Sequence, residues 1–359
     1  MIQKIGIIGL GVIGGSLGMA LRSNGLGVIV AGRDLDESTV AQAIELGAID
    51  QMLDDRFLAQ CDLVILAAPL TAMPAVMEQI KAHVKPGAII SDAGSVKGWV
   101  MQQLEAHFPA DVFIVGGHPM AGSEKSGLQA ADKFLLENAA YILTPRTGTP
   151  EAVIAQLQEL LTAIGARVVI MNAAEHDQAV ARVSHLPHLM STALINNLLT
   201  QPEFMNLAGG GLRDSTRTAA SDPDLWEDIL FLNADAIGQE LAAIQQLLSI
   251  YRHSLQRKGD GVLRTYLQSA STTRKNLPGL RPCLAEACDV IAIIPDQPGV
   301  IGTVGTLLGQ ANINIQNLQL LNVRDEDEGS IKITVPRESA PGACQILKQH
   351  GFQSWLLEK

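Results

Sequence analysis

Short runs of β-branched and other apolar residues alternate with helical patterns through residues 1–171. Strands that alternate with helices predict right-handed crossovers and a parallel sheet covered by helices on both faces. Ligands of such folds bind at the carboxyl ends of the strands. We therefore expect an α/β domain whose functional side chains lie at that edge. The runs are IGIIG (5–9), VIVAG (28–32), DLVILAAP (62–69), GAIISDAG (87–94), VFIVGGHP (112–119), AYILTP (140–145) and Arg167–Met171.

A glycine motif, Gly9-Leu10-Gly11-Val12-Ile13-Gly14, follows the first run and opens a helical stretch, and Asp34 ends the second run. Glycines there let the backbone approach a pyrophosphate, whose charge meets the helix N-terminus. A carboxylate at the position of Asp34 accepts hydrogen bonds from ribose hydroxyls. Glycines that serve only tight packing are the alternative, which the flanking strand, helix and acid disfavour. The domain is therefore predicted to be a Rossmann-type dinucleotide-binding fold.

The nucleotide preference depends on Arg33, Asp34 and Pro69. The carboxylate repels a 2′-phosphate and favours NAD, whereas the adjacent arginine could bind that phosphate, so NADP stays open. The small residues before Pro69, at the end of the third run, would let the cofactor lie close. An ordinary strand end is the other interpretation of this segment.

Charge and composition limit the partners. A net charge of −11 disfavours binding to nucleic-acid phosphates and favours a small soluble ligand. The apolar start MIQKIGIIGLGVIGGSLGMAL contains glycines that oppose a stable apolar helix, so we interpret it as part of the fold and not as a signal peptide. No other stretch is long and uncharged enough to predict a membrane span. Cysteines without a Cys-x-x-Cys pair predict reduced thiols in a cytoplasmic protein. They are Cys61, Cys283, Cys288 and Cys344.

Residues 172–280 have a different pattern, because apolar residues recur at spacings of three and four over long segments. This pattern predicts an all-α domain. Its amphipathic helices have little else to pack against, so we expect them to form a homodimer.

Residues 281–359 follow the linker-like segment KNLPGLRPCL (275–284). Strand and helix patterns then succeed one another in the order βαββαβ, which predicts a ferredoxin-like domain. An acidic turn, RDEDEG (324–329), separates its second and third strands.

His118 stands among glycines in the segment GGHPMAGSEKSG (116–127), and we expect it just past the strand that the fifth run forms. Gly116, Gly117 and Gly122 would let a loop bend there and come close to a ligand. A histidine is suited to proton transfer near neutral pH, although one that only caps the sheet is an equal alternative.

His185 and His188 are three apart and share a helix face. They could form half of a zinc site, but no third ligand lies at a suitable spacing, and we predict no metal.

Several motifs together carry a family resemblance. Behind the glycine motif, in order, come DAGSVKG (92–98), GGHPMAGSEKSG, HDQAVARVSHLPH (176–188) and GGGLRDSTRTAASDP (209–223). This combination resembles the prephenate and arogenate dehydrogenases of tyrosine biosynthesis over roughly residues 1–280. The remainder, with DQPGVIGTVGTLLGQANINI (296–315), looks like an ACT domain, a regulatory module that often binds amino acids.

The resemblance implies an oxidative decarboxylation of prephenate to 4-hydroxyphenylpyruvate, with hydride transfer to NAD. His118 would take the proton of the ring hydroxyl, and Ser95 would share that hydrogen bond or cap the following helix. Arg217 would hold a substrate carboxylate, and His188 would contact the substrate. Relatives that prefer arogenate can lack this second histidine, so prephenate is favoured over arogenate. Lys97 would attract anions or lie solvated on the surface.

The likeness to an ACT domain implies tyrosine as an effector, bound near Gly299 and Asn312. A tail used only for contacts between subunits is the alternative. A nucleotide-bound amino-acid sensor without catalysis is the rival from another functional class, and the motif residues His118, Ser95 and Arg217 argue against it.

Overall fold

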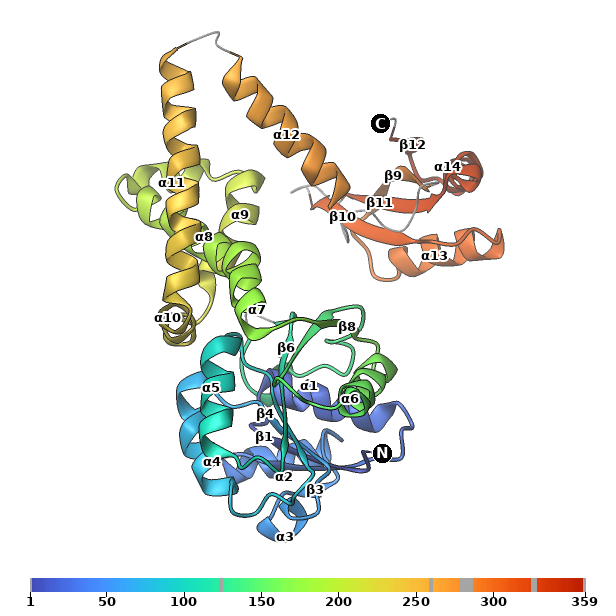
Figure 1. The fold of residues 1–359 in the computed structure, drawn as a ribbon. Coiled ribbons are helices and arrows are strands. Elements are labelled where there is room, and N and C mark those ends of the chain that lie inside the picture. Colours follow the sequence, from blue (N-terminus) through green and yellow to red (C-terminus); the bar gives the residue numbers. More distant parts are fainter. Residues whose placement is uncertain (1, 123–124, 258–260, 278–286, 324–327, 358–359) are drawn as a thin grey trace. The chain divides into compact units, whose positions relative to one another are not determined.

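The structure is a computed structural model that describes residues 2–122, 125–257, 261–277, 287–323 and 328–357. The chain divides into two compact units, Met1–Leu248 and Ser249–Lys359, which are described separately. Figure 1 shows the elements along the chain. No helix among the described residues is long and apolar enough to cross a membrane.

The first unit contains an eight-stranded sheet with the order β3-β2-β1-β4-β5-β6-β7-β8. Strands β3 to β6 are parallel, and the order reverses between β1 and β4, which is where nucleotides bind in doubly wound folds. The expected α/β domain is therefore present, with one short strand, β3, that the sequence pattern had not indicated. The strands are β1 (Lys4–Ile8), β2 (Ile29–Arg33), β3 (Gln51–Met52), β4 (Leu63–Leu66), β5 (Ile89–Asp92), β6 (Phe113–Pro119), β7 (Ala140–Pro145) and β8 (Arg167–Ile170).

Strand β7 departs from the predicted parallel arrangement, because it runs antiparallel to β6. Parallel neighbours need a long crossover, usually a helix. The described part of the β6–β7 connection contains only one helical turn, η2 (Leu128–Ala130). Strand β8 is again parallel to β7, to which helix α6 (Glu151–Ala163) connects it. The prediction of an entirely parallel sheet is thus wrong for β7.

Helices cover both faces of the sheet (Figure 1) and bury two apolar clusters against it. One face packs Leu17, Val40 and Leu157 from the helices α1, α2 and α6. The other packs Phe57, Met77 and Val100 from α3, α4 and α5. The first five helices are α1 (Val12–Ser23), α2 (Glu37–Glu45), α3 (Asp55–Leu58), α4 (Met73–Ile80) and α5 (Lys97–His107).

The chain from Ala173 to Asn276 consists, where it is described, of helices joined by short turns, as the apolar periodicity predicts. A π-helical turn, η3 (Ala181–His185), interrupts it before α8. Pro187 has no N–H for the carbonyl four residues back, and the N–H of Leu186 bonds to the carbonyl of Ala181, five residues back. The elements are α7 (Ala173–Val180), α8 (Leu186–Leu198), η4 (Pro202–Leu207), α9 (Gly210–Thr216), η5 (Arg217–Ala220), α10 (Pro223–Leu232), α11 (Ala234–Gln256) and α12 (Val262–Asn276).

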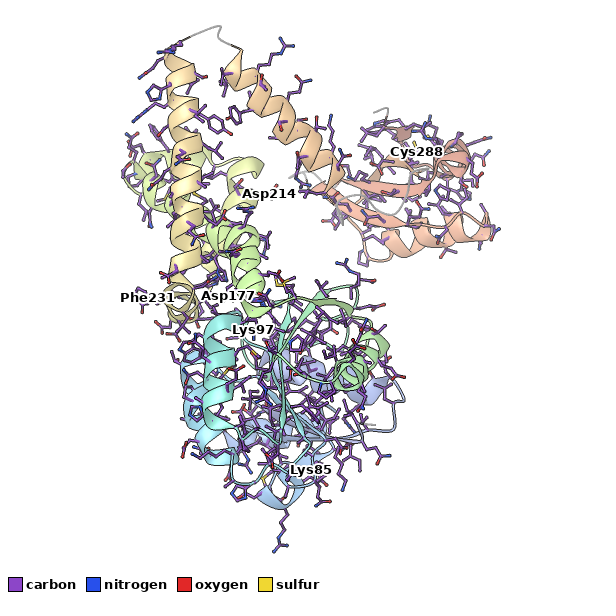
Figure 2. All side chains as sticks on the ribbon, viewed as in Figure 1. Lys85, Lys97, Asp177, Asp214, Phe231 and Cys288 are labelled. Carbon is purple, nitrogen blue, oxygen red and sulfur yellow. The ribbon has the colours of Figure 1, made fainter. Side chains whose placement is uncertain are left out.

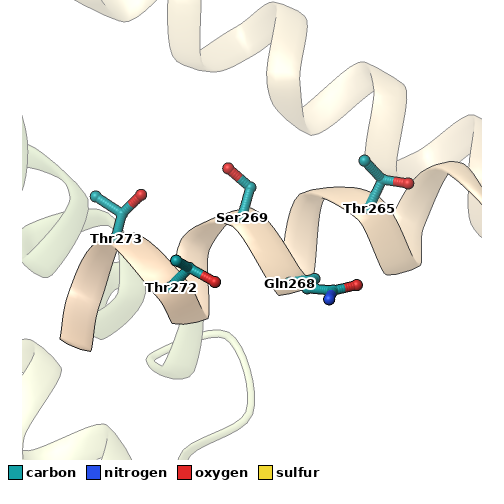
Figure 3. A pocket seen from close by; sticks show the side chains of 5 residues that line it. All are labelled: Thr265, Gln268, Ser269, Thr272 and Thr273. Carbon is teal, nitrogen blue, oxygen red and sulfur yellow. The ribbon is translucent and has the colours of Figure 1, made fainter. Parts of the chain in front are cut away.

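The second unit includes α12 and a small βαββαβ module. Helix α12 buries no side chain, and a row of polar residues lines a groove along it (Figure 3). The module's sheet is antiparallel with the order β10-β11-β9-β12, and Val290, Val304, Ile331 and Leu347 are buried in its core. Most of the linker and of the acidic turn lies outside the described residues. The module contains β9 (Ala287–Pro295), α13 (Val300–Gln310), β10 (Asn317–Val323), β11 (Glu328–Pro336), α14 (Ala340–Gln349) and β12 (Ser354–Leu356).

Candidate active site

Four of the predicted site segments lie at one edge of the large sheet. Gly9 follows β1, Pro69 follows β4, Ser95 follows β5, and His118 lies near the end of β6. Because these strands are parallel, their carboxyl ends share that edge. The structure therefore brings the nucleotide motif and the candidate base to the same side of the first unit.

The glycine loop after β1 brings backbone segments closer together than a side chain would allow. Gly9 has a φ of +96°, and a Cβ there would lie 2.6 Å from the backbone of Ala67. A Cβ on Gly14 would collide with the carbonyl oxygen of Gly9 at 1.9 Å, so this glycine permits close packing of helix and strand. Gly11 has no protein atom within 4 Å of its Cβ direction and begins α1 without a side-chain cap. The helix N-terminus is thus open to a phosphate group.

Asp34 and Arg33 have different surroundings. The carboxylate of Asp34 accepts the N–H of Leu10 at 2.7 Å, which places it against the glycine loop. The guanidinium of Arg33 donates to the carbonyl of Leu53 at 2.9 Å and to Asp55 at 2.8 Å. The side chain that could bind a 2′-phosphate is therefore already held by an adjacent loop.

His118 lies within β6 and not past its end, opposite Ile142 of β7. Gly116 and Gly117 are strand residues too, so the expected loop bend at these glycines is wrong. Their lack of a side chain has another cause: a Cβ on Gly116 would meet Thr144 at 2.4 Å, and one on Gly117 would meet the carbonyl oxygen of Asp92 at 2.4 Å. Gly122 has open space in its Cβ direction.

His118 is the first member of a hydrogen-bonded chain that the sequence alone did not reveal. Its Nδ1 lies 2.7 Å from Nε2 of His176, and Nδ1 of His176 lies 2.8 Å from Oδ1 of Asp177. His176 is fully buried, and His118 is 8% exposed. Burial, followed by the positive charge of Lys97 and of other histidines, lowers the pKa of His118 well below its ordinary value. The imidazole is therefore neutral at neutral pH and able to accept a proton.

Lys97 is completely buried, which rules out the solvated surface lysine. Its ammonium group pairs with Asp92 and donates to the carbonyl of Gly117 at 2.8 Å. The carboxylate of Asp92 also accepts the N–H groups of Gly94 and Gly117. This pair joins the end of β5, the strand β6 and the start of α5 directly beside His118.

Ser95 is half-buried, and its side chain does not cap α5, so that alternative for its role is wrong. The N–H groups of Lys97 and Gly98 donate instead to the carboxylate of Asp177, at 2.7 and 2.8 Å. Asp177 therefore caps α5 and orients His176, its neighbour on α7. Figure 2 shows Lys97 and Asp177 where α5 meets α7.

The second histidine pair surrounds an indole. His188 stacks on Trp226 with a centroid distance of 3.6 Å, and His185 meets the same ring edge-on at 6.0 Å. Nδ1 of His188 and Oγ of Ser191, one turn later, are buried without a hydrogen-bond partner. Such atoms suit a polar ligand. Nδ1 of His185 bonds instead to Asn233 at 3.1 Å.

Arg217 begins η5, which packs against α8, the helix of His188. Its side chain is exposed. In the second unit Gly299 has a φ of +88° and precedes α13, and Asn312 has a φ of +55° just after that helix. Among the described residues no group of His, Cys, Asp or Glu side chains could hold a metal ion.

The sequence patterns did not single out His176, Asp177, Asp92 or Trp226 as site residues. Two of them open the motif HDQAVARVSHLPH, and a third opens DAGSVKG. Membership of these motifs was the available signal. The contact between His118 and His176 joins positions that are 58 residues apart in the sequence, and such a contact appears only in the folded chain.

Comparisons with known proteins identify two family models along the chain. The nucleotide-binding domain of prephenate dehydrogenase matches residues 17–170, and the dimerization domain of prephenate dehydrogenase matches residues 172–269. A prephenate dehydrogenase of Bacillus subtilis is 34% identical over 346 residues, which are 93% of this chain and 92% of the relative.

Two solved structures have the same fold. Prephenate dehydrogenase from Aquifex aeolicus, in complex with hydroxyphenyl propionate and NAD+, is 30% identical with a TM-score of 0.71. The alignment covers 77% of this chain and 98% of that one. Arogenate dehydrogenase from Synechocystis is also 30% identical, with a TM-score of 0.68, over 76% of this chain and 99% of that one.

Proposed function

The chain belongs to the prephenate dehydrogenase family, and from this premise we propose how its residues oxidise and decarboxylate prephenate. The enzyme is an oxidoreductase that uses NAD and forms 4-hydroxyphenylpyruvate, CO₂ and NADH. The observation that carries the assignment is a neutral, buried His118 at the sheet edge that also holds the glycine loop.

His118 accepts the proton of the ring hydroxyl while hydride leaves the carbon that bears it. A neutral imidazole has the free lone pair that this step requires. Loss of CO₂ then leaves its electron pair in the ring, and the phenolate oxygen takes a proton back from the imidazolium. Ser95 lies at the adjacent strand end, and we assign it the second hydrogen bond to the same hydroxyl. The net reaction releases no proton.

NAD would be held by Gly9, Gly11, Gly14, Asp34 and Pro69. NAD supplies the hydride acceptor when bound. The open N-terminus of α1 would meet the pyrophosphate, and Asp34 would accept from the ribose hydroxyls. The ion pair of Arg33 with Asp55 supports NAD over NADP, because a 2′-phosphate would have to displace that carboxylate.

Prephenate carries two carboxylates, and the protein is acidic overall, so local cations must recognise the substrate. We assign Arg217 to one carboxylate. We assign His188 to a polar group of the substrate, since its buried Nδ1 has no protein partner. Arogenate is the second candidate substrate, because the relative from Synechocystis is an arogenate dehydrogenase.

The C-terminal module has the βαββαβ order of a ferredoxin-like fold, and we propose that it is an ACT domain. Tyrosine would bind near Gly299 and Asn312 and bias the catalytic unit. The match of residues 172–269 to a dimerization domain supports a homodimer. A cytoplasmic location stays a prediction from the cysteines.

The test is an initial-rate assay that follows NADH absorbance. Prephenate and arogenate are each offered with NAD and with NADP, with and without tyrosine. We expect prephenate with NAD to give the highest kcat/KM, and tyrosine to lower the rate. A higher kcat/KM for arogenate would reassign the substrate, and no reduction of either nucleotide with either substrate would refute the function.

A further inference from the structure

We infer that His176 and Asp177 are positioning residues that hold His118 in the one neutral tautomer whose Nε2 can accept a proton. The inference deepens the proposed function and rests on it, since the substrate hydroxyl supplies that proton. It assigns a role to two side chains that lie behind the base. The geometry that supports it is a chain of two short hydrogen bonds that ends on a carboxylate.

The direction of the hydrogen bonds follows from what each group can donate. A carboxylate only accepts, so Nδ1 of His176, which lies 2.8 Å from Asp177, carries a proton. The other nitrogen of a neutral imidazole is then an acceptor. Nε2 of His176 therefore accepts from Nδ1 of His118 at 2.7 Å. His118 is left with its lone pair on Nε2, the ring nitrogen that does not take part in the hydrogen bond to His176.

His176 is neutral in this arrangement because burial lowers its pKa, which Asp177 only partly offsets. In the opposite tautomer of His118, Nδ1 of His118 would carry the lone pair, and Nε2 of His176 would have to donate to it. Nδ1 of His176 would then have no proton, and its lone pair would face the carboxylate of Asp177. That arrangement sets two acceptors against each other in a site without solvent exposure at His176. The chain thus selects the tautomer that the reaction needs.

Asp177 is itself fixed from two other elements. Its carboxylate accepts the N–H groups of Lys97 and Gly98 at the start of α5. Its carbonyl accepts the side-chain amide of Asn233, at the end of α10, at 2.9 Å. The charged or titratable groups that act on His118 are Lys97 of α5 and His176 and His185 of the helical segment, and Asp92 of β5 pairs with Lys97 and acts on His176.

The experiment compares His176→Phe with His176→Gln. Phenylalanine keeps the ring volume but cannot accept from His118, whereas the glutamine side-chain oxygen can. We expect His176→Phe to lower kcat by roughly 10- to 100-fold, by analogy with the loss of the partner that orients a metal-bound histidine. KM for prephenate should change little, and glutamine should restore part of kcat. The acid limb of kcat/KM should move to lower pH in the phenylalanine variant, because the imidazolium loses its acceptor.

A purely space-filling His176 predicts the reverse order, with phenylalanine at normal kcat and an unshifted pH profile. That result would overturn the inference. Asp177→Asn is the second variant, since an amide that turns its NH₂ toward His176 reverses the donors along the chain. It should lose at least as much kcat as His176→Phe. Its thermal unfolding is measured alongside, because this residue also caps α5.

His118→Asn separates this inference from the proposed function. Removal of a general base costs on the order of 10²- to 10⁴-fold in kcat, while NAD should still bind. Near-normal kcat in His118→Asn would refute the base itself. Loss in His118→Asn combined with normal kcat in His176→Phe would refute only the positioning role.

Discussion

The amino ends of the parallel strands form one edge of the large sheet, the amino edge, and their carboxyl ends form the other, the carboxyl edge. Each edge carries an aspartate–lysine pair that joins neighbouring strands, and the pairs differ mainly in their access to water. At the amino edge Asp62 accepts the N–H groups of Gln3 and Lys4 and pairs with Lys85 at 2.6 Å. Asp62 and Lys85 are 28% and 35% exposed. At the carboxyl edge Asp92 also accepts two backbone N–H groups and pairs with Lys97, but both side chains are fully buried. Figure 2 labels the two lysines.

The two ion pairs have similar partners but differ in their exposure to water, so they affect stability differently. Water solvates the Asp62–Lys85 pair in the folded and in the unfolded chain, so it contributes little to stability. Burial of Asp92 and Lys97 costs desolvation energy that their attraction repays only in good geometry. What the buried pair provides is position, because Lys97 also holds the carbonyl of Gly117, the residue before His118. At the carboxyl edge the ion pair thus fixes the position of the site residues at a cost in stability.

Lys97→Met should have the largest effect on stability. It leaves the carboxylate of Asp92 buried without its cation, and breaking a buried pair in this way costs about 3–5 kcal/mol. Urea unfolding of the full chain, analysed at a constant m-value, measures the loss. The activity should fall as well, because β6 loses a side-chain anchor beside the base.

The control for this prediction is the double variant Asp92→Leu, Lys97→Met. Replacing both partners with apolar side chains removes the unpaired buried charge and should recover part of the lost stability. It leaves the N–H groups of Gly94 and Gly117 without their acceptor, and kcat should not recover. If the double variant were fully active, the pair would have no role in placing His118. If Lys97→Met unfolded at the same urea concentration as the parent, the contrast between the edges would disappear.

The pH dependence of stability should also differ between the edges. Burial lowers the pKa of His118, His176, His185 and His188, for His185 to about 4 from 6.5. The unfolded chain binds these protons first, so stability is full above about pH 6.5 and falls as the pH drops toward the folded values. For Asp62, burial raises the pKa, but the hydrogen bonds from Lys85 and the two N–H groups outweigh it. Its contribution is lost only as the pH falls below 3.8.

His185→Gln tests this difference. Each proton that only the unfolded chain binds adds about 1.4 kcal/mol per pH unit to the slope of stability. The variant should flatten the slope between pH 6 and 4.5 by up to that amount, as measured by urea unfolding at several pH values. His83→Gln, which removes an exposed histidine at the amino edge, is the matched control. Equal slopes in all three proteins would contradict the assignment to buried histidines.

Lys85→Met should have the smallest effect, a loss of about 0–1 kcal/mol, because its pair with Asp62 is partly exposed. The loss should shrink further in 1 M salt, which screens exposed pairs but not buried ones. Thermal unfolding at low and high salt measures both quantities. A loss as large as that of Lys97→Met would mean that exposure does not distinguish the pairs.

The sequence predicted the features that depend on local patterns. The glycine loop at Gly9–Gly14, the helical segment and the βαββαβ order follow from periodicity and from residues whose geometry is nearly fixed. The direction of β7 could not be predicted, because it depends on how residues 120–139 return to the sheet. The roles of Lys97 and Asp177 were missed for a related reason. A charged residue is expected at the surface, and only long-range contacts show that these two face inward or cap a distant helix.

The π-helical turn before α8 has a consequence for register. A helix advances about 100° per residue, so one additional residue in a turn rotates everything after it by that angle. The turn at Ala181–His185 therefore sets which side chain of α8 stacks on Trp226, and in this chain it is His188. A substitution that converted this turn to regular α-helix would leave the composition almost unchanged, yet it would rotate α8 by one residue and direct a different side chain toward the indole.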